Sequence, residues 1–109
     1  MQATVSFYRP NRVYGIALHP SIYCDGVELL RLHNGTYFSV KLTPGKHMLS
    51  SGRSEVGQFV DLEAGKEYFF RFDLKKSSMF TGAPPVVLVP MAAETAKAEM
   101  NGLKVVEPE

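Results

Sequence analysis

The residues of this chain best suited to contact a ligand are two tyrosines and two arginines near its N-terminal end. Tyr8, Arg9, Arg12 and Tyr14 belong to a long connection that runs from the first predicted strand to Pro20. Arginine offers a planar fork of donors and tyrosine a flat face with a hydroxyl, so this group could stack on and hydrogen-bond a sugar or a peptide. Alternatively, Tyr14 and the apolar residues after it plug one end of the fold while the arginines stay solvated. The sequence leaves both interpretations open.

A second connection, residues 75–82, presents Met79 and Phe80 between polar residues. These two side chains form either an exposed contact patch or a flap folded on the core, and the sequence does not choose between them. The candidate ligand or partner contacts are therefore Tyr8, Arg9, Arg12, Tyr14, Met79 and Phe80.

The three histidines do not converge on a metal in the predicted strand register. His33 and His47 fall at opposite ends of one sheet, near 20 Å apart at ~3.3 Å per residue, whereas zinc ligands lie ~2 Å from one point. His19 precedes Pro20 in a connection and has no partner at ligand spacing. Cys24, the one cysteine, lies within a predicted strand, where a small buried hydrophobic residue is expected. We predict no metal site and no cofactor.

The sequence contains no residue pattern that is typical of a hydrolase. The serines occur in polar turns and connections, and no Gly-x-Ser-x-Gly elbow is present. Asp61 and Glu63 are two residues apart, but they lead into a turn, and Glu107 and Glu109 belong to the terminal tail. We therefore predict that the protein is not an enzyme.

Size and charge narrow the class of protein further. The chain has 109 residues, which fits a single domain over 1–109 with one core. Its 12 Lys and Arg against 11 Asp and Glu give a net charge of +1, so no global field attracts nucleic acid. No apolar run approaches the ~20 residues of a membrane span, and residues 1–4 have no features of a signal peptide.

Four glycine turns must position these side chains: Asp25-Gly26, Asn34-Gly35, Pro44-Gly45 and Ala64-Gly65. Each lies between short runs rich in β-branched and aromatic residues, which is typical of antiparallel hairpins. With two-residue turns, Cys24 pairs with Val27, His33 with Thr36, and Leu42 with His47. The predicted inward row is Ile22, Leu29, Val40 and Leu49.

The remaining segments complete a sandwich. A further hairpin around Ala64-Gly65 places Val60 beside Phe70 and Leu62 beside Tyr68, and strands are expected near 3–8 and 86–89. Ala93, Ala96, Met100 and Leu103 recur at helical spacing and predict a helix over about 91–102, which covers the sandwich or binds a partner. The predicted fold is all-β: an antiparallel β-sandwich of seven to eight strands over about 3–90, immunoglobulin-like or prealbumin-like, with a short C-terminal α-helix.

Several turn motifs in order resemble the bacterial domain of unknown function 2846 and, distantly, PEGA repeats. They are Phe7-Tyr8-Arg9-Pro10, Ile22-Tyr23-Cys24-Asp25-Gly26, Leu32-His33-Asn34-Gly35-Thr36-Tyr37-Phe38, Leu42-Thr43-Pro44-Gly45-Lys46-His47 and Leu62-Glu63-Ala64-Gly65-Lys66-Glu67-Tyr68-Phe69-Phe70. The resemblance covers about residues 3 to 103. It implies a small β-sandwich that is periplasmic or envelope-associated, often as a lipoprotein, and it implies no established activity.

We therefore expect a non-catalytic binding or structural adaptor module of the bacterial cell envelope, with a protein or a glycan as partner. The alternative is an interaction protein that acts by sheet-edge pairing or self-association.

Overall fold

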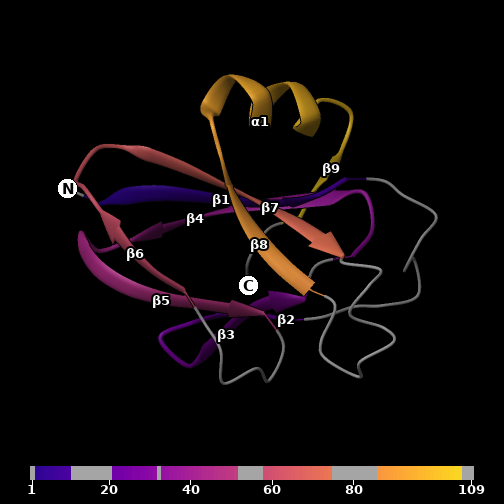
Figure 1. Ribbon diagram of the computed structural model, residues 1–109. Coiled ribbons are helices and arrows are strands. Elements are labelled where there is room, and N and C mark those ends of the chain that lie inside the picture. The colour runs from indigo at the N-terminus through magenta and orange to yellow at the C-terminus, as the bar shows by residue number, and fades with distance from the viewer. Residues whose placement is uncertain (1, 11–20, 32, 52–57, 75–85, 107–109) are drawn as a thin grey trace.

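The computed structural model describes residues 2–10, 21–31, 33–51, 58–74 and 86–106, which form nine strands and one helix in two stacked sheets (Figure 1). The first sheet contains β1 (Ala3–Arg9), β4 (Thr36–Leu42), β7 (Glu67–Leu74), β8 (Val86–Met91) and β9 (Lys104–Val105). The second sheet contains β2 (Ser21–Cys24), β3 (Val27–Arg31), β5 (Gly45–Ser51) and β6 (Gln58–Leu62). Helix α1 (Ala93–Met100) lies on the outer side of the first sheet.

The mostly β architecture of two sheets and one short helix is as predicted, but the first sheet is mixed and the described residues form nine strands. The predicted strand number of seven to eight and the purely antiparallel pairing were therefore wrong. The order of the first sheet is β8-β7-β1-β4-β9, and β1 runs parallel to β7 and antiparallel to β4. The ninth strand, β9, has two residues and runs parallel to β4. A first strand with no hairpin partner can complete its hydrogen bonds in either direction, and a two-residue strand has no alternation to read.

The Asp25-Gly26 turn closes the predicted hairpin between β2 and β3. Asp25 and Gly26 both have positive φ, 52° and 83°, as the tight hairpin turn of a twisted ribbon requires. Cys24 pairs with Val27, which confirms the predicted register at the turn. A bulge between Ile22 and Tyr23 then shifts the pairing, so that Ile22 lies opposite Leu30 rather than Leu29.

The other three glycine turns carry the chain from one sheet to the other. β3 and β4, β4 and β5, and β6 and β7 are consecutive in sequence but belong to different sheets. The predicted pairings of His33 with Thr36 and of Leu42 with His47 were therefore wrong, as was the pairing of β6 with β7. A glycine turn makes the chain reverse, but the same local conformation serves a hairpin or a corner between sheets. β5 pairs instead with β2 and β6.

The predicted inward residues do line the core between the sheets. Ile22 and Leu49 are buried, and Leu29 and Val40 pack against the same cluster, although the four come from two sheets rather than one row. The centre of this core is an aromatic stack in which the ring of Phe7 lies 5.2 Å from that of Phe38 and 5.7 Å from that of Phe70. The predicted inward direction of these side chains is therefore correct, although the strands pair differently than predicted.

Helix α1 is shorter than predicted, at Ala93–Met100, and packs on the outer face of the first sheet. Ala96 is fully buried in a second cluster with Tyr8 and Phe69, and Met100 and Leu103 pack beside it. Ala93, by contrast, is exposed. No helix in the described part of the chain is long and apolar enough to cross a bilayer.

Candidate functional site

Two of the predicted contact residues, Tyr8 and Arg9, lie in strand β1 and not in a loop. Both are buried, with 0% and 3% of their surface exposed. Neighbouring residues of a strand point to opposite faces, so Tyr8 lies under helix α1 while Arg9 lies at the end of the core between the sheets. The two side chains are therefore not brought together. Arg12, Tyr14, Met79 and Phe80 lie outside the described residues.

Tyr8 takes part in the attachment of helix α1. Its hydroxyl donates to Oε1 of Glu99 at 2.5 Å, and Nη1 of Arg71 donates to both carboxylate oxygens of Glu99 at 3.2 Å. Arg71 and Glu99 are both mostly buried. Hydrogen bonds to a charged group in such surroundings are stronger than those between neutral groups, so this contact fixes α1 on the first sheet.

Arg9 stacks on an aromatic ring. Its guanidinium lies 5.1 Å from the ring centroid of Phe72, within the range of a cation–π contact. Burial lowers the pKa of the Arg9 guanidinium, but an arginine remains a cation in proteins. Arg9 thus closes the end of the core between the sheets.

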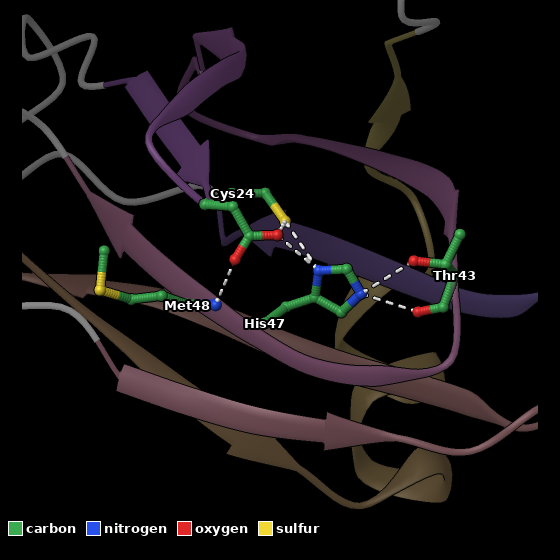
Figure 2. Close-up of polar contacts among 5 residues, drawn as sticks. Cys24, Thr43, His47 and Met48 are labelled. Atoms are coloured by element: carbon green, nitrogen blue, oxygen red, sulfur yellow. Dashed lines mark hydrogen bonds and ion pairs between the residues drawn. The ribbon is translucent and has the colours of Figure 1, made fainter.

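A polar cluster that the sequence did not reveal lies where β2 meets β5 (Figure 2). Cys24 is the last residue of β2, Asp25 begins the turn, and His47 comes from β5. Nδ1 of His47 lies 2.6 Å from Oδ2 of Asp25 and 3.8 Å from Sγ of Cys24, and that sulfur lies 3.6 Å from the same Oδ2.

Both nitrogens of the His47 ring act as donors. Nδ1 donates to the Asp25 carboxylate, and Nε2 donates to the carbonyl oxygen of Thr43 at 2.7 Å. Neither acceptor carries a proton, so the arrangement favours the imidazolium form. The bond to Asp25, followed by the bond to Thr43, raises the pKa of His47. The backbone N–H of Met48, followed by His47, lowers the pKa of Asp25.

This geometry does not activate the thiol. Burial, followed by the Asp25 charge and hydrogen bond, raises the pKa of Cys24 to about 11, which keeps it protonated at neutral pH. A nucleophilic cysteine needs the thiolate and a neighbouring base, but Nδ1 is already occupied by Asp25. With the thiol protonated, the hydrogen bonds of this cluster connect the turn to β5.

The same three side chains could hold a metal ion, because one ligand atom from each lies within 4.8 Å of the others. The predicted pairings of Cys24 with Val27, His33 with Thr36 and Leu42 with His47 put two strands between Cys24 and His47. Pairing of β2 with β5, in which Cys24 lies opposite Leu49, brings them together. The sequence feature that could have indicated this cluster is a cysteine directly before an Asp-Gly turn.

The outer face of the second sheet is a further candidate site. Strand alternation places Tyr23, Lys46, Met48 and Phe59 on this face, opposite the core residues Cys24, Leu49 and Leu62. Phe59 is 67% exposed, pairs with Met48 and lies 5.5 Å beneath the Lys46 ammonium. Figure 2 shows the Met48 side chain directed away from the His47 ring, in agreement with this assignment. We call these four residues the aromatic face.

A shallow, open pocket of about 480 Å³ lies beside the C-terminal half of α1. It is lined by Tyr37, Lys97, Ala98, Met100 and Asn101. Lys97 is the one acidic or basic side chain among the described residues of this lining, so these residues supply no convergent acid–base set.

Comparison with known proteins identifies a family without an assigned activity. A family model described as "Protein of unknown function (DUF2846)" matches residues 1–84. No curated protein and no solved structure gave a significant match.

Proposed function

This chain belongs to the DUF2846 family of proteins of unknown function, and from that premise we propose that it is a non-catalytic binding or structural adaptor module of the bacterial cell envelope. The proposed binding surface is the aromatic face, Tyr23, Lys46, Met48 and Phe59. The proposed partner is a protein or a glycan. The buried Tyr8 and Arg9 are not part of this surface.

The exposure of Phe59 is the observation that carries the proposal. The two sheets differ in what covers their outer sides, since α1 packs on the first sheet while no described element packs on the outer face of the second. A phenylalanine with 67% of its surface exposed, next to Met48 and beneath a lysine, is an apolar patch with a polar rim. Such patches are typical of contact surfaces.

The chemistry of the aromatic face suits flat ligands. A pleated sheet holds its side chains at fixed spacing, and aromatic rings add large contact area at a small cost in side-chain entropy. Tyr23 and Phe59 can stack on sugar rings or on apolar side chains of a protein, while Lys46 can donate to hydroxyls or carboxylates. A rigid scaffold that carries such residues is the usual form of a binding module.

A glycan array and a cell-wall pull-down, each with the full chain and with Phe59→Ser, test this proposal. Loss of an exposed aromatic anchor should reduce partner capture at least about tenfold, as hot-spot truncations do. The matched control is Val105→Ser, which removes another exposed hydrophobic residue, 58% exposed, on the first sheet. Capture that Phe59→Ser leaves unchanged would contradict the aromatic face as the binding surface.

The N-terminal connection is tested in the same assay. The double variant Arg12→Ser with Tyr14→Ser removes its basic and aromatic groups without altering Phe59. If capture depends on this double variant and not on Phe59, the protein is still a binding module, but its ligand contacts lie in the connection.

The envelope location and the finer fold are part of the proposal. Location in the periplasm or at the envelope, often in lipoprotein form, is what the family resemblance implies. An immunoglobulin-like or prealbumin-like sandwich is supported by connections that cross between two sheets, as in Greek-key folds. Fractionation of cells that express the natural gene tests the location.

Edge pairing is the second candidate function, and the strand order favours it. β3 and β6 are the edge strands of the second sheet, so each has one described neighbour. An edge strand offers unpaired N–H and C=O groups to a partner strand or to a second copy. Sedimentation velocity over a wide concentration range tests self-association, and a strictly monomeric species would contradict it.

A further inference from the structure

We propose that Cys24, Asp25 and His47 form a binding site for a borderline-soft divalent cation, with Zn²⁺ as the best fit. A thiolate, an imidazole nitrogen and a carboxylate oxygen are the three ligand types that zinc prefers in proteins. The three residues come from the end of β2, its turn and β5, so the ion would join two neighbouring strands. This inference goes beyond the proposed binding function and does not depend on it.

The distances among the ligand atoms fit a tetrahedral ion. With Zn–S of ~2.3 Å and Zn–N and Zn–O of ~2.1 Å, the edges that include sulfur are ~3.6 Å and the N–O edge is ~3.4 Å. The sulfur lies 3.6 Å from Oδ2 of Asp25 and 3.8 Å from Nδ1 of His47, close to those values. The N–O separation is 2.6 Å because a proton now joins these atoms. Replacing that proton with the ion would lengthen this one edge.

The surroundings orient the ligands as they do in known metal sites. A metal-bound histidine almost always donates its other ring N–H to a carbonyl or carboxylate, and Nε2 of His47 donates to the Thr43 carbonyl (Figure 2). That bond leaves Nδ1 as the ligand nitrogen. The N–H of Met48 donates to Oδ1 of Asp25 at 2.8 Å, which holds Oδ2 toward the sulfur and the imidazole.

The charges of the ligands and the exposure of the site also suit a divalent cation. A thiolate and a carboxylate balance the two positive charges of the ion, and the protons of the thiol and of Nδ1 are released to solvent. The side chain of Asp25 is 51% exposed while that of His47 is 12% exposed, so the site is open on the carboxylate side. Water would occupy the fourth position, as in zinc sites with three protein ligands.

Cobalt substitution tests the site without any mutation. Co²⁺ added to the reduced, tag-free full chain should bind one ion per chain, with the strong visible absorption of tetrahedral Co²⁺ and a sulfur-to-cobalt charge-transfer band in the near ultraviolet. Because Cys24 is the one cysteine of the chain, that band would identify it as the ligand. One equivalent of Zn²⁺ should then abolish the spectrum.

Single variants assign the other ligands. Asp25→Asn and His47→Gln should each weaken Zn²⁺ binding at least about tenfold in competition with a chromophoric chelator, and Cys24→Ser should remove the charge-transfer band. His33→Gln is the matched control, since it removes a histidine from another turn and should bind as the wild type does. Circular dichroism confirms that each variant is folded.

Three results would overturn the inference. They are the absence of saturable Zn²⁺ binding to the folded wild-type chain, a cobalt spectrum with no sulfur band, and equal loss of affinity in His33→Gln and His47→Gln. Failure of this site would leave the proposed role of the aromatic face untouched, because Phe59→Ser alters none of the three ligands.

Discussion

At the scale of the single residue, the pKa values of His47 and Cys24 depend on the polar groups that the fold places beside them. His47 has an Asp25 carboxylate on one ring nitrogen and a Thr43 carbonyl on the other, and both raise its pKa. Cys24 is buried beside the same carboxylate, and its pKa rises to about 11. The contact between His47 and Asp25 joins residues far apart in the sequence, which no local pattern would pair.

The ion pair of Asp25 and His47 should make stability depend on pH in metal-free protein. The folded pKa of His47 is raised above 6.5, so its contribution is complete below pH 6.5 and is lost as the pH rises through the folded pKa. The folded pKa of Asp25 lies below 3.8, so its contribution is present above pH 3.8 and is lost as the pH falls through the folded pKa. The stabilisation is therefore largest between these limits.

Urea unfolding of wild type and His47→Gln, both in excess EDTA, measures this contribution. The wild type should exceed the variant by about 0.2–1 kcal/mol near pH 5–6, and the difference should shrink above the folded pKa of His47. His33→Gln is the matched control, because it removes a histidine from another turn. A difference that grows as the pH rises from 6 to 9 would contradict the assignment.

At the scale of the element, helix α1 is held by one small residue and one acid. Ala96 allows close approach to Tyr8 and Phe69, and Glu99 accepts hydrogen bonds from Tyr8 and Arg71. The helix has no side-chain hydrogen bond at its N-terminal cap, Ala92, so its tertiary contacts matter more than its own ends.

Glu99→Ala should therefore destabilise the protein by about 1–3 kcal/mol, because it removes a partly buried, charged acceptor. Glu99→Gln should cost less, since the amide oxygen can still accept from Tyr8 while the ion pair with Arg71 is lost. The matched control is Thr95→Ala on the exposed side of the same helix, which should change stability by less than about 0.5 kcal/mol. Chemical unfolding measures all three, and equal values for Glu99→Ala and Thr95→Ala would refute the anchoring role.

At the scale of the whole molecule, the two sheets share one core, and β1 is central to it. β1 lies between β4 and β7 in the first sheet, and its inward residues Ala3, Val5 and Phe7 are fully buried. The chain crosses between the sheets at three glycine turns and also between β1 and β2, so each sheet is assembled from segments distant in sequence. Such pairings lower the folding rate because loops must close before contacts form.

Phe7→Ala should cost about 3–5 kcal/mol, because it leaves a cavity in the aromatic stack with Phe38 and Phe70. Phe59→Ala is the matched control: it removes the same side chain from the aromatic face, where 67% of it is exposed, and should change stability by less than about 0.5 kcal/mol. Denaturant titration with fluorescence and circular dichroism compares the two. A large effect of Phe59→Ala would mean that the outer face is covered in solution.

Unfolding of Phe7→Ala should remain a single transition. Because the same core joins both sheets, loss of the stack should weaken them together, and the two probes should give coincident curves. Separate transitions for the two probes would show that unfolding is not a single cooperative step.

The sequence by itself determined which residues are inward, where the chain turns and where the period changes to that of a helix. Ile22, Leu29, Val40 and Leu49 contact the core as their alternation predicted, and the Asp25-Gly26 hairpin has its predicted register next to the turn, because these features depend on neighbours within a few residues. The family resemblance was also readable from the turn motifs.

Only the tertiary structure decided which strands pair and therefore which residues form the candidate sites. The alternation at Asn34-Gly35 and Pro44-Gly45 is the same whether the chain stays in one sheet or crosses to the other, so local pattern could not reveal that β5 pairs with β2. That pairing brings His47 to Cys24 and Asp25, and the placement of β1 buries Tyr8 and Arg9 on opposite faces. Strand partners are chosen by how well whole faces pack, and packing is a property of the assembled chain.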